Sequence, residues 1–205
     1  LKRDRFFLQG NEALNNREYK TAVDYFTKAL TIDKDFARGY NNRGVARIES
    51  GHPYEAIQDY NLALALKPDY VGALFNRAYA YEEVGRLEDA LDDVANVKEF
   101  HSDSAYVYFY EGLLQSKLRL YDQSLASFEK ARSLDSDNEE IDINVATLYY
   151  FKGEFEKARG LLLEILKVNA QQLNALNTLS QIYLKEADFQ NALITINRAL
   201  KVKPS

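Results

Sequence analysis

The residue types that usually carry out catalysis are scarce in this sequence of 205 residues. Its two histidines, His52 and His101, lack the second histidine four residues away that a zinc site on a helix needs. Neighbouring acids such as Glu82 and Glu83 point in different directions on a helix, so they do not form an acid–base pair. The chain has no cysteine and no glycine-rich phosphate-binding loop. We therefore expect no enzyme activity, no cofactor and no metal site.

Two stretches of the chain repeat one another. YNNRGVARIESG begins at Tyr40, and LFNRAYAYEEVG begins 34 residues later at Leu74. Each contains an Asn–Arg pair followed by a small residue, and each closes on glycine. Such recurrence at a fixed spacing indicates a chain built from one repeated structural unit.

The 34-residue period runs through the whole chain as columns of residues of similar size. One column of small residues is Ala22, Ala56, Ala90, Ser124, Ala158 and Ala192. A second is Gly10, Gly44, Ala78, Gly112, Ala146 and Ser180. A column of large residues is Phe26, Tyr60, Val94, Phe128, Leu162 and Ile196. Six copies without an insertion predict a solenoid, in which small residues let helix backbones approach and large ones fill the space beside them.

Each repeat has the pattern of two helices. Apolar residues recur at intervals of three and four in the first repeat, as in Tyr19, Ala22, Val23, Phe26, Ala29 and Leu30. Gly51, Gly85 and Gly153 fall between the two halves, where a helix end favours a residue that tolerates positive φ. Aspartates recur between repeats, at Asp35, Asp69, Asp103 and Asp137, and we expect them to cap the helices that follow.

This pattern resembles that of the tetratricopeptide repeat family. The sixth unit carries the family's positions at Leu176, Leu179, Ser180, Tyr183, Ala192, Ile196, Ala199 and Pro204. Arg47 and Gln115 stand where the family usually has Tyr, and Asp142 takes a usually bulky place, without breaking the register. The resemblance implies an all-α fold, a right-handed superhelical solenoid of six helix-turn-helix repeats that forms one array over residues 1–205. Its repeats are 3–36, 37–70, 71–104, 105–138, 139–172 and 173–205.

In the resembled fold the first helices of the repeats line a concave groove, so the resemblance implies a scaffold or adaptor that binds a peptide or helix of a partner protein there. The residues expected to line this groove are Phe7, Asn11, Asn41, Asn42, Phe75, Asn76, Tyr79, Glu82, Tyr106, Phe109, Asn144, Tyr150 and Phe151. Other lining positions include Glu140, Ile143, Thr147, Asn174 and Asn177. The rings would form an aromatic floor and the asparagines would hydrogen-bond the ligand; alternatively, tight curvature buries several rings between neighbouring helices.

Charge and composition narrow the partners. A net charge of −5 argues against nucleic acid, and no apolar run approaches the roughly 18–20 residues that cross a membrane. Glu49, Glu82 and Glu83 point toward the groove and would select basic side chains. Because the chain begins at Leu1 and contains no Met, we expect it to be a piece of a longer protein. The absence of cysteine is compatible with either redox compartment, so the localisation is not predicted.

The sequence also bears on three functions other than the binding of a peptide. Chaperone-binding members of the resembled family hold a carboxylate with two asparagines and three cations; here Asn11 and Asn42 match, but Phe7, Gly72 and Asn76 replace the cations, which disfavours chaperone tails. A carbohydrate or another small ligand could stack on the aromatic groove. Self-assembly is also open, because nothing in the sequence covers the last apolar stripe, Leu193, Ile196 and Leu200. We expect the last repeat to fray, to pair with another copy, or to be covered by residues absent here.

Overall fold

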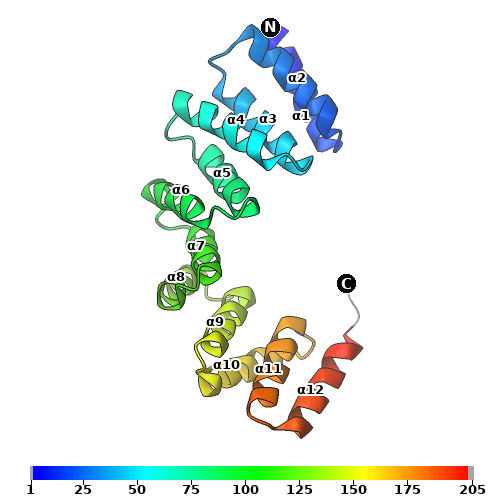
Figure 1. Cartoon of the computed structure of the whole chain (residues 1–205), viewed down its shortest axis with the longest axis vertical. Coiled ribbons are helices and arrows are strands. Elements are labelled where there is room, and N and C mark those ends of the chain that lie inside the picture. Colours follow the sequence, from blue (N-terminus) through cyan, green and yellow to red (C-terminus); the bar gives the residue numbers. More distant parts are fainter. Residues whose placement is uncertain (1, 203–205) are drawn as a thin grey trace. The chain divides into compact units, whose positions relative to one another are not determined.

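A computed structural model describes residues 2–202 of the chain, and this described part consists of twelve α-helices without a strand (Figure 1). One helix pair falls in each predicted repeat, which confirms the all-α fold of helical repeats. Pro204, part of the sixth-repeat pattern, lies outside the described residues. The helices are α1 (Lys2–Asn15), α2 (Tyr19–Ile32), α3 (Ala37–Glu49), α4 (Pro53–Leu66), α5 (Val71–Glu83), α6 (Leu87–Phe100), α7 (Ala105–Lys117), α8 (Tyr121–Leu134), α9 (Glu139–Phe151), α10 (Phe155–Val168), α11 (Leu173–Lys185) and α12 (Phe189–Lys201).

The helices group into two compact units, residues 1–102 with α1 to α6 and residues 103–205 with α7 to α12. In each unit the two helices of a repeat pack against each other. First helices also contact the first helix of the next repeat, α1 with α3 and α3 with α5 in the first unit, and α9 with α11 in the second. Each unit therefore has a face made of first helices.

The turn within each repeat ends the first helix in the same way. His52 N–H donates to the Arg47 carbonyl and Gly51 N–H to the Ile48 carbonyl, the two bonds of a Schellman motif. The motif requires positive φ at its C′ residue, and Gly51, Gly85 and Gly153 have φ of 81°, 77° and 78°. The predicted role of these glycines is confirmed. The three remaining turns place Arg17, Arg119 and Ala187 in the same conformation.

The predicted capping role of the aspartates is wrong. The residue before each helix at these boundaries lies one position later, at Phe36, Tyr70, Ser104 and Asn138, and only Asn138 accepts a side-chain cap hydrogen bond. Phe36 fills this position because its ring packs against Phe7, with centroids 4.9 Å apart. Burial of an aromatic ring between repeats therefore takes the place of a polar cap.

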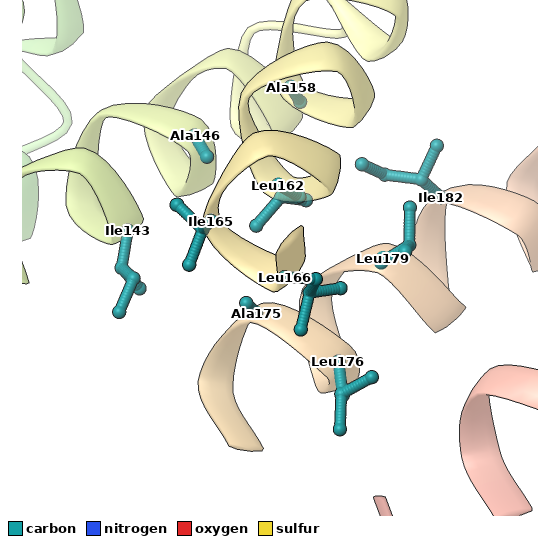
Figure 2. Packing of buried hydrophobic residues seen from close by; sticks show 10 residues of the cluster. All are labelled: Ile143, Ala146, Ala158, Leu162, Ile165, Leu166, Ala175, Leu176, Leu179 and Ile182. Atoms are coloured by element: carbon teal, nitrogen blue, oxygen red, sulfur yellow. The ribbon is translucent and has the colours of Figure 1, made fainter. Parts of the chain in front are cut away.

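Small and large residues face each other within each repeat as the columns predict. A Cβ added at Gly10, Gly44 or Gly112 would lie 2.5–2.7 Å from the ring of Phe26, Tyr60 or Phe128 respectively, so no side chain larger than hydrogen fits there. Where the large column holds an aliphatic residue, the small column can hold Ala or Ser. The second unit shows this in Figure 2, where Leu162 and Ala146 belong to one buried cluster with residues of α9, α10 and α11.

Candidate functional site

In the first unit, four asparagines of the first helices form one hydrogen-bonded chain, called here the amide chain. Asn76 Nδ2 donates to Asn41 Oδ1 over 3.0 Å, and Asn41 Nδ2 donates to Asn42 Oδ1 over 3.0 Å. Asn42 Nδ2 then donates to Asn11 Oδ1 over 2.7 Å. The amide chain thus crosses α5, α3 and α1. It leaves Asn76 Oδ1 and Asn11 Nδ2 without a hydrogen bond among the described residues.

Carboxylates surround Tyr79, one turn beyond the amide chain on α5. The pKa of Tyr79 is raised above its ordinary value, first by the charge of Glu83, then by burial and a hydrogen bond to Glu83, and by the charges of Glu49 and Glu82. Negative charge from Glu49 on α3, and from Glu82 and Glu83 on α5, therefore acts on Tyr79. The Tyr79 side chain remains 46% exposed, so its ring is accessible there.

In the second unit, the first helices α7, α9 and α11 line a pocket of about 330 Å³. Asn144 donates its Nδ2 to the Glu140 carbonyl, and the Thr147 hydroxyl donates to the Ile143 carbonyl. The Asn144 side-chain oxygen and the Asn174 and Asn177 side chains make no hydrogen bond within residues 2–202. The pocket is lined by Leu113, Glu140, Ile143, Asn144, Thr147, Asn174, Asn177 and Thr178. All but Leu113 and Thr178 are among the groove positions named in the sequence analysis.

Phe7 and Phe109, two of the rings expected to line the groove, are buried instead. Phe7 is 6% exposed and packs on Phe26, and Phe109 is 8% exposed and packs on Phe128. Phe7 also packs on Phe36, at the start of the next repeat, and Phe109 shares a buried cluster with Ile141 of α9. These two predicted rings are therefore not available to stack on a ligand.

The remaining predicted rings lie in different surroundings. Phe75 is half-buried, whereas Tyr106 and Phe151 are exposed. Phe151 stacks on Tyr121 of α8, with centroids 6.0 Å apart, and Tyr150 contacts Phe155 of α10. Phe151 and Tyr150 thus contact second helices and are not among the residues that line the pocket of the second unit.

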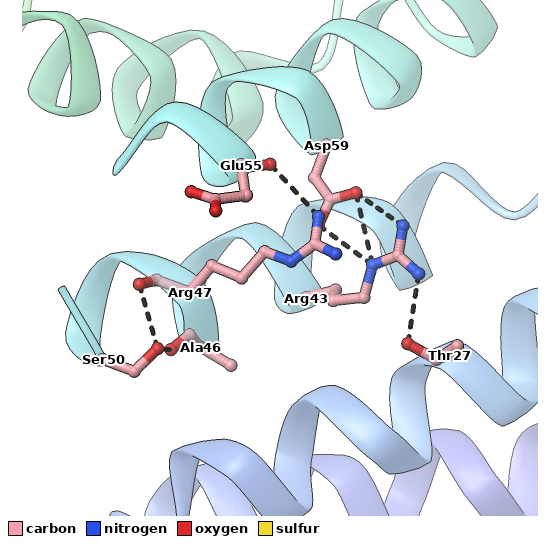
Figure 3. Close-up of polar contacts among 7 residues, drawn as sticks. All are labelled: Thr27, Arg43, Ala46, Arg47, Ser50, Glu55 and Asp59. Atoms are coloured by element: carbon pink, nitrogen blue, oxygen red, sulfur yellow. Dashed lines mark hydrogen bonds and ion pairs between the residues drawn. The ribbon is translucent and has the colours of Figure 1, made fainter. Parts of the chain in front are cut away.

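A set of buried ion pairs was not foreseen. Asp59 of α4 is fully buried and accepts hydrogen bonds from Arg43 and Arg47 of α3 (Figure 3). Arg77 and Asp93 form the equivalent pair in the next repeat, at 2.6 Å. Arg43 also donates to Thr27 of the preceding repeat over 3.1 Å, so it joins two repeats. The signal in the sequence was an Arg and an Asp 16 residues apart that recur after 34 residues.

The last described helix presents apolar side chains to solvent. Leu193 is 60% exposed and Leu200 78%, while Ile196 of the predicted stripe is half-buried. Phe189 and Ile194 of the same helix are also exposed. In residues 2–202, no helix combines the length and the apolar character that spanning a membrane requires.

Family models described as tetratricopeptide repeat match residues 7–71, 42–100, 119–182 and 173–205. The chain is 36% identical over 96 residues to sperm-associated antigen 1 of Mus musculus, which covers 47% of this chain and 10% of that protein. It is 26% identical over 205 residues to protein O-mannosyl-transferase TMTC3 of Homo sapiens, covering 98% of this chain and 22% of that protein. The chain thus spans only a small part of either relative.

Solved structures share the fold. A tetratricopeptide repeat protein from Parabacteroides merdae superposes with a TM-score of 0.91 at 16% identity, over 100% of this chain and 81% of that one. YrrB, described as a TPR protein with an unusual peptide-binding site, has a TM-score of 0.68 at 18% identity, over 88% and 93% of the two chains. Proteins with this fold generally mediate protein–protein interaction, and such scaffolds are typically not enzymes. On its repeat pattern, its helix pairs and these matches, the chain belongs to the tetratricopeptide repeat family.

Proposed function

We propose that the face of first helices in the first unit binds an extended peptide segment of a partner protein. The observation that carries this proposal is the amide chain, which crosses three first helices and ends in one free acceptor, Asn76 Oδ1, and one free donor, Asn11 Nδ2. An extended peptide offers N–H and C=O groups along its length, so it can satisfy both ends. The internal hydrogen bonds hold the amides in place before binding, which lowers the ordering cost of association.

The carboxylates around Tyr79 give the partner segment a chemical character. Glu49, Glu82 and Glu83 raise the pKa of Tyr79, so a Lys or Arg side chain placed there would meet negative charge from two helices. The exposed Tyr79 ring could also accept the cation on its face. The proposed ligand is therefore an extended segment with at least one basic side chain.

Selection from a random peptide library on the whole chain, followed by titration of the selected peptides, tests the proposal. We expect basic peptides that bind Asn42→Ala at least about tenfold more weakly, because this substitution removes a hydrogen bond to Asn41 and another to Asn11. Asn197→Ala, in exposed α12, is the matched control and should bind as the wild type does. The proposal is contradicted if the selected peptides bind Asn42→Ala as tightly as the wild type, or if the library yields no binding peptide.

A second candidate function, self-association, is favoured by the exposed apolar side chains of α12. Leu193 and Leu200 are exposed by more than half, and burying such surface against a second copy would be favourable. Sedimentation velocity over a hundredfold range of concentration tests this. The sedimentation coefficient should rise with concentration for the wild type and stay constant for Leu193→Lys with Leu200→Lys. A wild type that sediments as a monomer throughout would exclude this candidate.

A further inference from the structure

A second pocket lies in the first unit, where α2 meets the turn between α3 and α4. Its volume is about 390 Å³, and it is lined by Lys20, Val23, Arg47, Ser50, His52 and Glu55. Lys20 and Val23 come from α2, Arg47 is on α3, and Glu55 is on α4. None of these residues belongs to the amide chain or to the cluster around Tyr79. The pocket is therefore separate from the proposed peptide site.

Positive charge in this pocket is only partly compensated. Arg47 Nη1 donates to Asp59 over 2.7 Å and to the Glu55 carbonyl over 3.2 Å, but Asp59 is already bonded to Arg43. Two guanidinium groups thus share one carboxylate. The Nε and Nη2 groups of Arg47 make no hydrogen bond among the described residues, and Lys20 has no ion pair or hydrogen bond there.

Corresponding places in the second unit are closed by ion pairs. Lys152 and Asp122, three repeats after Ser50 and Lys20, bridge α9 and α8 over 2.6 Å. Four repeats on from Val23 and Ser50, Arg159 pairs with Glu186 over 2.5 Å. In the first unit the corresponding positions hold Lys20, Val23 and Ser50. They therefore supply one cation, Lys20, and no carboxylate to pair with it.

Arg47 is itself a departure from the repeat pattern. The same position holds Tyr81, Tyr149 and Tyr183 in other repeats. Compared with a Tyr, Arg47 adds a fixed positive charge. Its Nε and Nη2 groups make no hydrogen bond among the described residues. At this junction, Arg47 and Lys20, the one cation among the six residues at its repeat position, lie in one pocket.

We propose that this pocket binds a small carboxylate with an apolar tail. Its carboxylate would take the place that Asp122 or Glu186 fills elsewhere, between the Lys20 ammonium and the Nε and Nη2 edge of Arg47, an edge that suits a planar two-oxygen acceptor. The tail would lie on Val23 and the aliphatic stem of Lys20. His52, whose Nδ1 lies 3.2 Å from the Ser50 hydroxyl, borders the same space. The one carboxylate that lines the pocket, that of Glu55, points away from the Arg47 guanidinium in Figure 3.

Titration of the whole chain with hexanoate, followed by amide and methyl NMR shifts, tests the proposal. Hexanoate should shift the signals of Val23 and His52, and it should bind more tightly than acetate, which lacks the tail, and hexanol, which lacks the charge. Lys20→Glu places an acid at this position, as the third to fifth repeats do, and should weaken binding of hexanoate at least about tenfold, the loss expected for one charge-assisted hydrogen bond. Arg47→Tyr, which restores the residue of other repeats, should have a similar effect.

Lys34→Glu makes the same change of charge at an exposed residue outside the pocket and serves as the control. Unchanged helical circular dichroism in each variant separates loss of the site from loss of the fold. The proposal is overturned if hexanoate shifts neither Val23 nor His52, or if Lys20→Glu and Lys34→Glu bind alike. Tighter binding of inorganic phosphate than of hexanoate would overturn the assignment to a carboxylate.

Discussion

Glycine and an aromatic ring occupy one space in three repeats, whereas Ala or Ser and an aliphatic side chain occupy it in the other three. Gly112 lies against Phe128, while one repeat later Ala146 is paired with Leu162, and all four residues are buried. Protein cores are packed too densely to accept an extra methyl group without movement. The small-column residue and the large-column residue of each repeat therefore form a matched pair. Dense packing depends on the combination of the two residues and not on either residue alone.

Gly112→Ala should lower the free energy of unfolding by about 1–3 kcal/mol, because its new Cβ would lie 2.7 Å from the fully buried Phe128 ring. In a Phe128→Leu background, which recreates the Ala146 and Leu162 pair, the same change should cost much less. Urea unfolding of the four proteins of this double-mutant cycle measures the coupling. Equal costs in both backgrounds would show that the ring does not exclude the methyl group.

Tyr60 is the large residue of the second repeat, and the residue is almost fully buried. Burial, followed by the charges of Asp59 and Glu49, raises the pKa of Tyr60 well above its ordinary value. The unfolded chain then loses this proton at lower pH than the folded chain, so the stability contribution is complete below pH 10 and falls as the pH rises above it.

The free energy of unfolding of Tyr60→Phe should therefore rise relative to that of the wild type only in alkaline solution. The difference in unfolding free energy should be nearly constant from pH 7 to 9 and should then grow by up to about 1.4 kcal/mol per pH unit above 10. Urea titrations at fixed ionic strength measure it. Tyr54→Phe, at a position that is 65% exposed, is the control and should show no such growth.

At the scale of the helix pair, six turns share one backbone conformation but only three have glycine in it. Arg17, Arg119 and Ala187 adopt φ of 62°, 60° and 59° without the freedom of glycine. A non-glycine residue in this region costs about 1–2 kcal/mol because its Cβ approaches the carbonyl oxygen. These three turns are therefore strained relative to those at Gly51, Gly85 and Gly153.

Ala187→Gly should raise the free energy of unfolding by about 0.5–1 kcal/mol, since relief of strain exceeds the entropy that glycine adds to the unfolded chain. Gly51→Ala should lower it by about the same amount, and a Cβ there would meet no atom within 4 Å, so only the backbone conformation changes. Thermal unfolding by calorimetry measures both. Opposite signs are required; a loss of stability with Ala187→Gly would refute the account.

Helix pairs, turns and core columns were predictable because period and residue size determine them locally. The capping role assigned to Asp35 and its equivalents was wrong, since each helix begins one residue later than the spacing suggests, and Phe36, which packs on Phe7, stands at the first of these N-caps. The positions of Phe7 and Phe109 were wrong for a related reason. A helical face alone does not reveal that Phe7 packs on Phe36, or that Phe109 joins a buried cluster with Ile141 of the next repeat.

The amide chain was predictable in part. Spacing placed Asn11, Asn42 and Asn76 on first helices, but their order in one chain of hydrogen bonds depends on how closely the helices approach. The buried Asp59 with its two arginines was missed because a charged residue inside a second helix is ordinarily assigned to solvent.

At the scale of the whole molecule, one position changes its chemistry along the chain. It holds Asp59 and Asp93 in the first unit, each paired with an arginine. In the second unit it begins with Ser127, which hydrogen-bonds Glu111 and Gln115, and it continues as Leu161. At this position, therefore, an Asp–Arg pair joins the two helices of a repeat in the first unit, whereas a neutral side chain stands there in the second.

This difference allows the two units to be perturbed separately. Asp59→Asn leaves two arginines without their carboxylate and should destabilise residues 2–102 by about 3 kcal/mol. Leu162→Ala opens a cavity at a fully buried site and should destabilise residues 103–202 by about as much. In repeat proteins each repeat contacts its neighbours only, so we expect each loss to stay within its own compact unit.

Native-state hydrogen exchange resolves the two effects amide by amide. Asp59→Asn should speed exchange in α1 to α6 and leave exchange in α8 to α12 unchanged. Leu162→Ala should speed exchange in α8 to α12 and leave exchange in α1 to α6 unchanged. Lys34→Ala, at an exposed site, should alter neither set. If either substitution instead speeds exchange equally in all the helices, the two units unfold as one cooperative body, and the charge pairs of the first unit then stabilise the second as well.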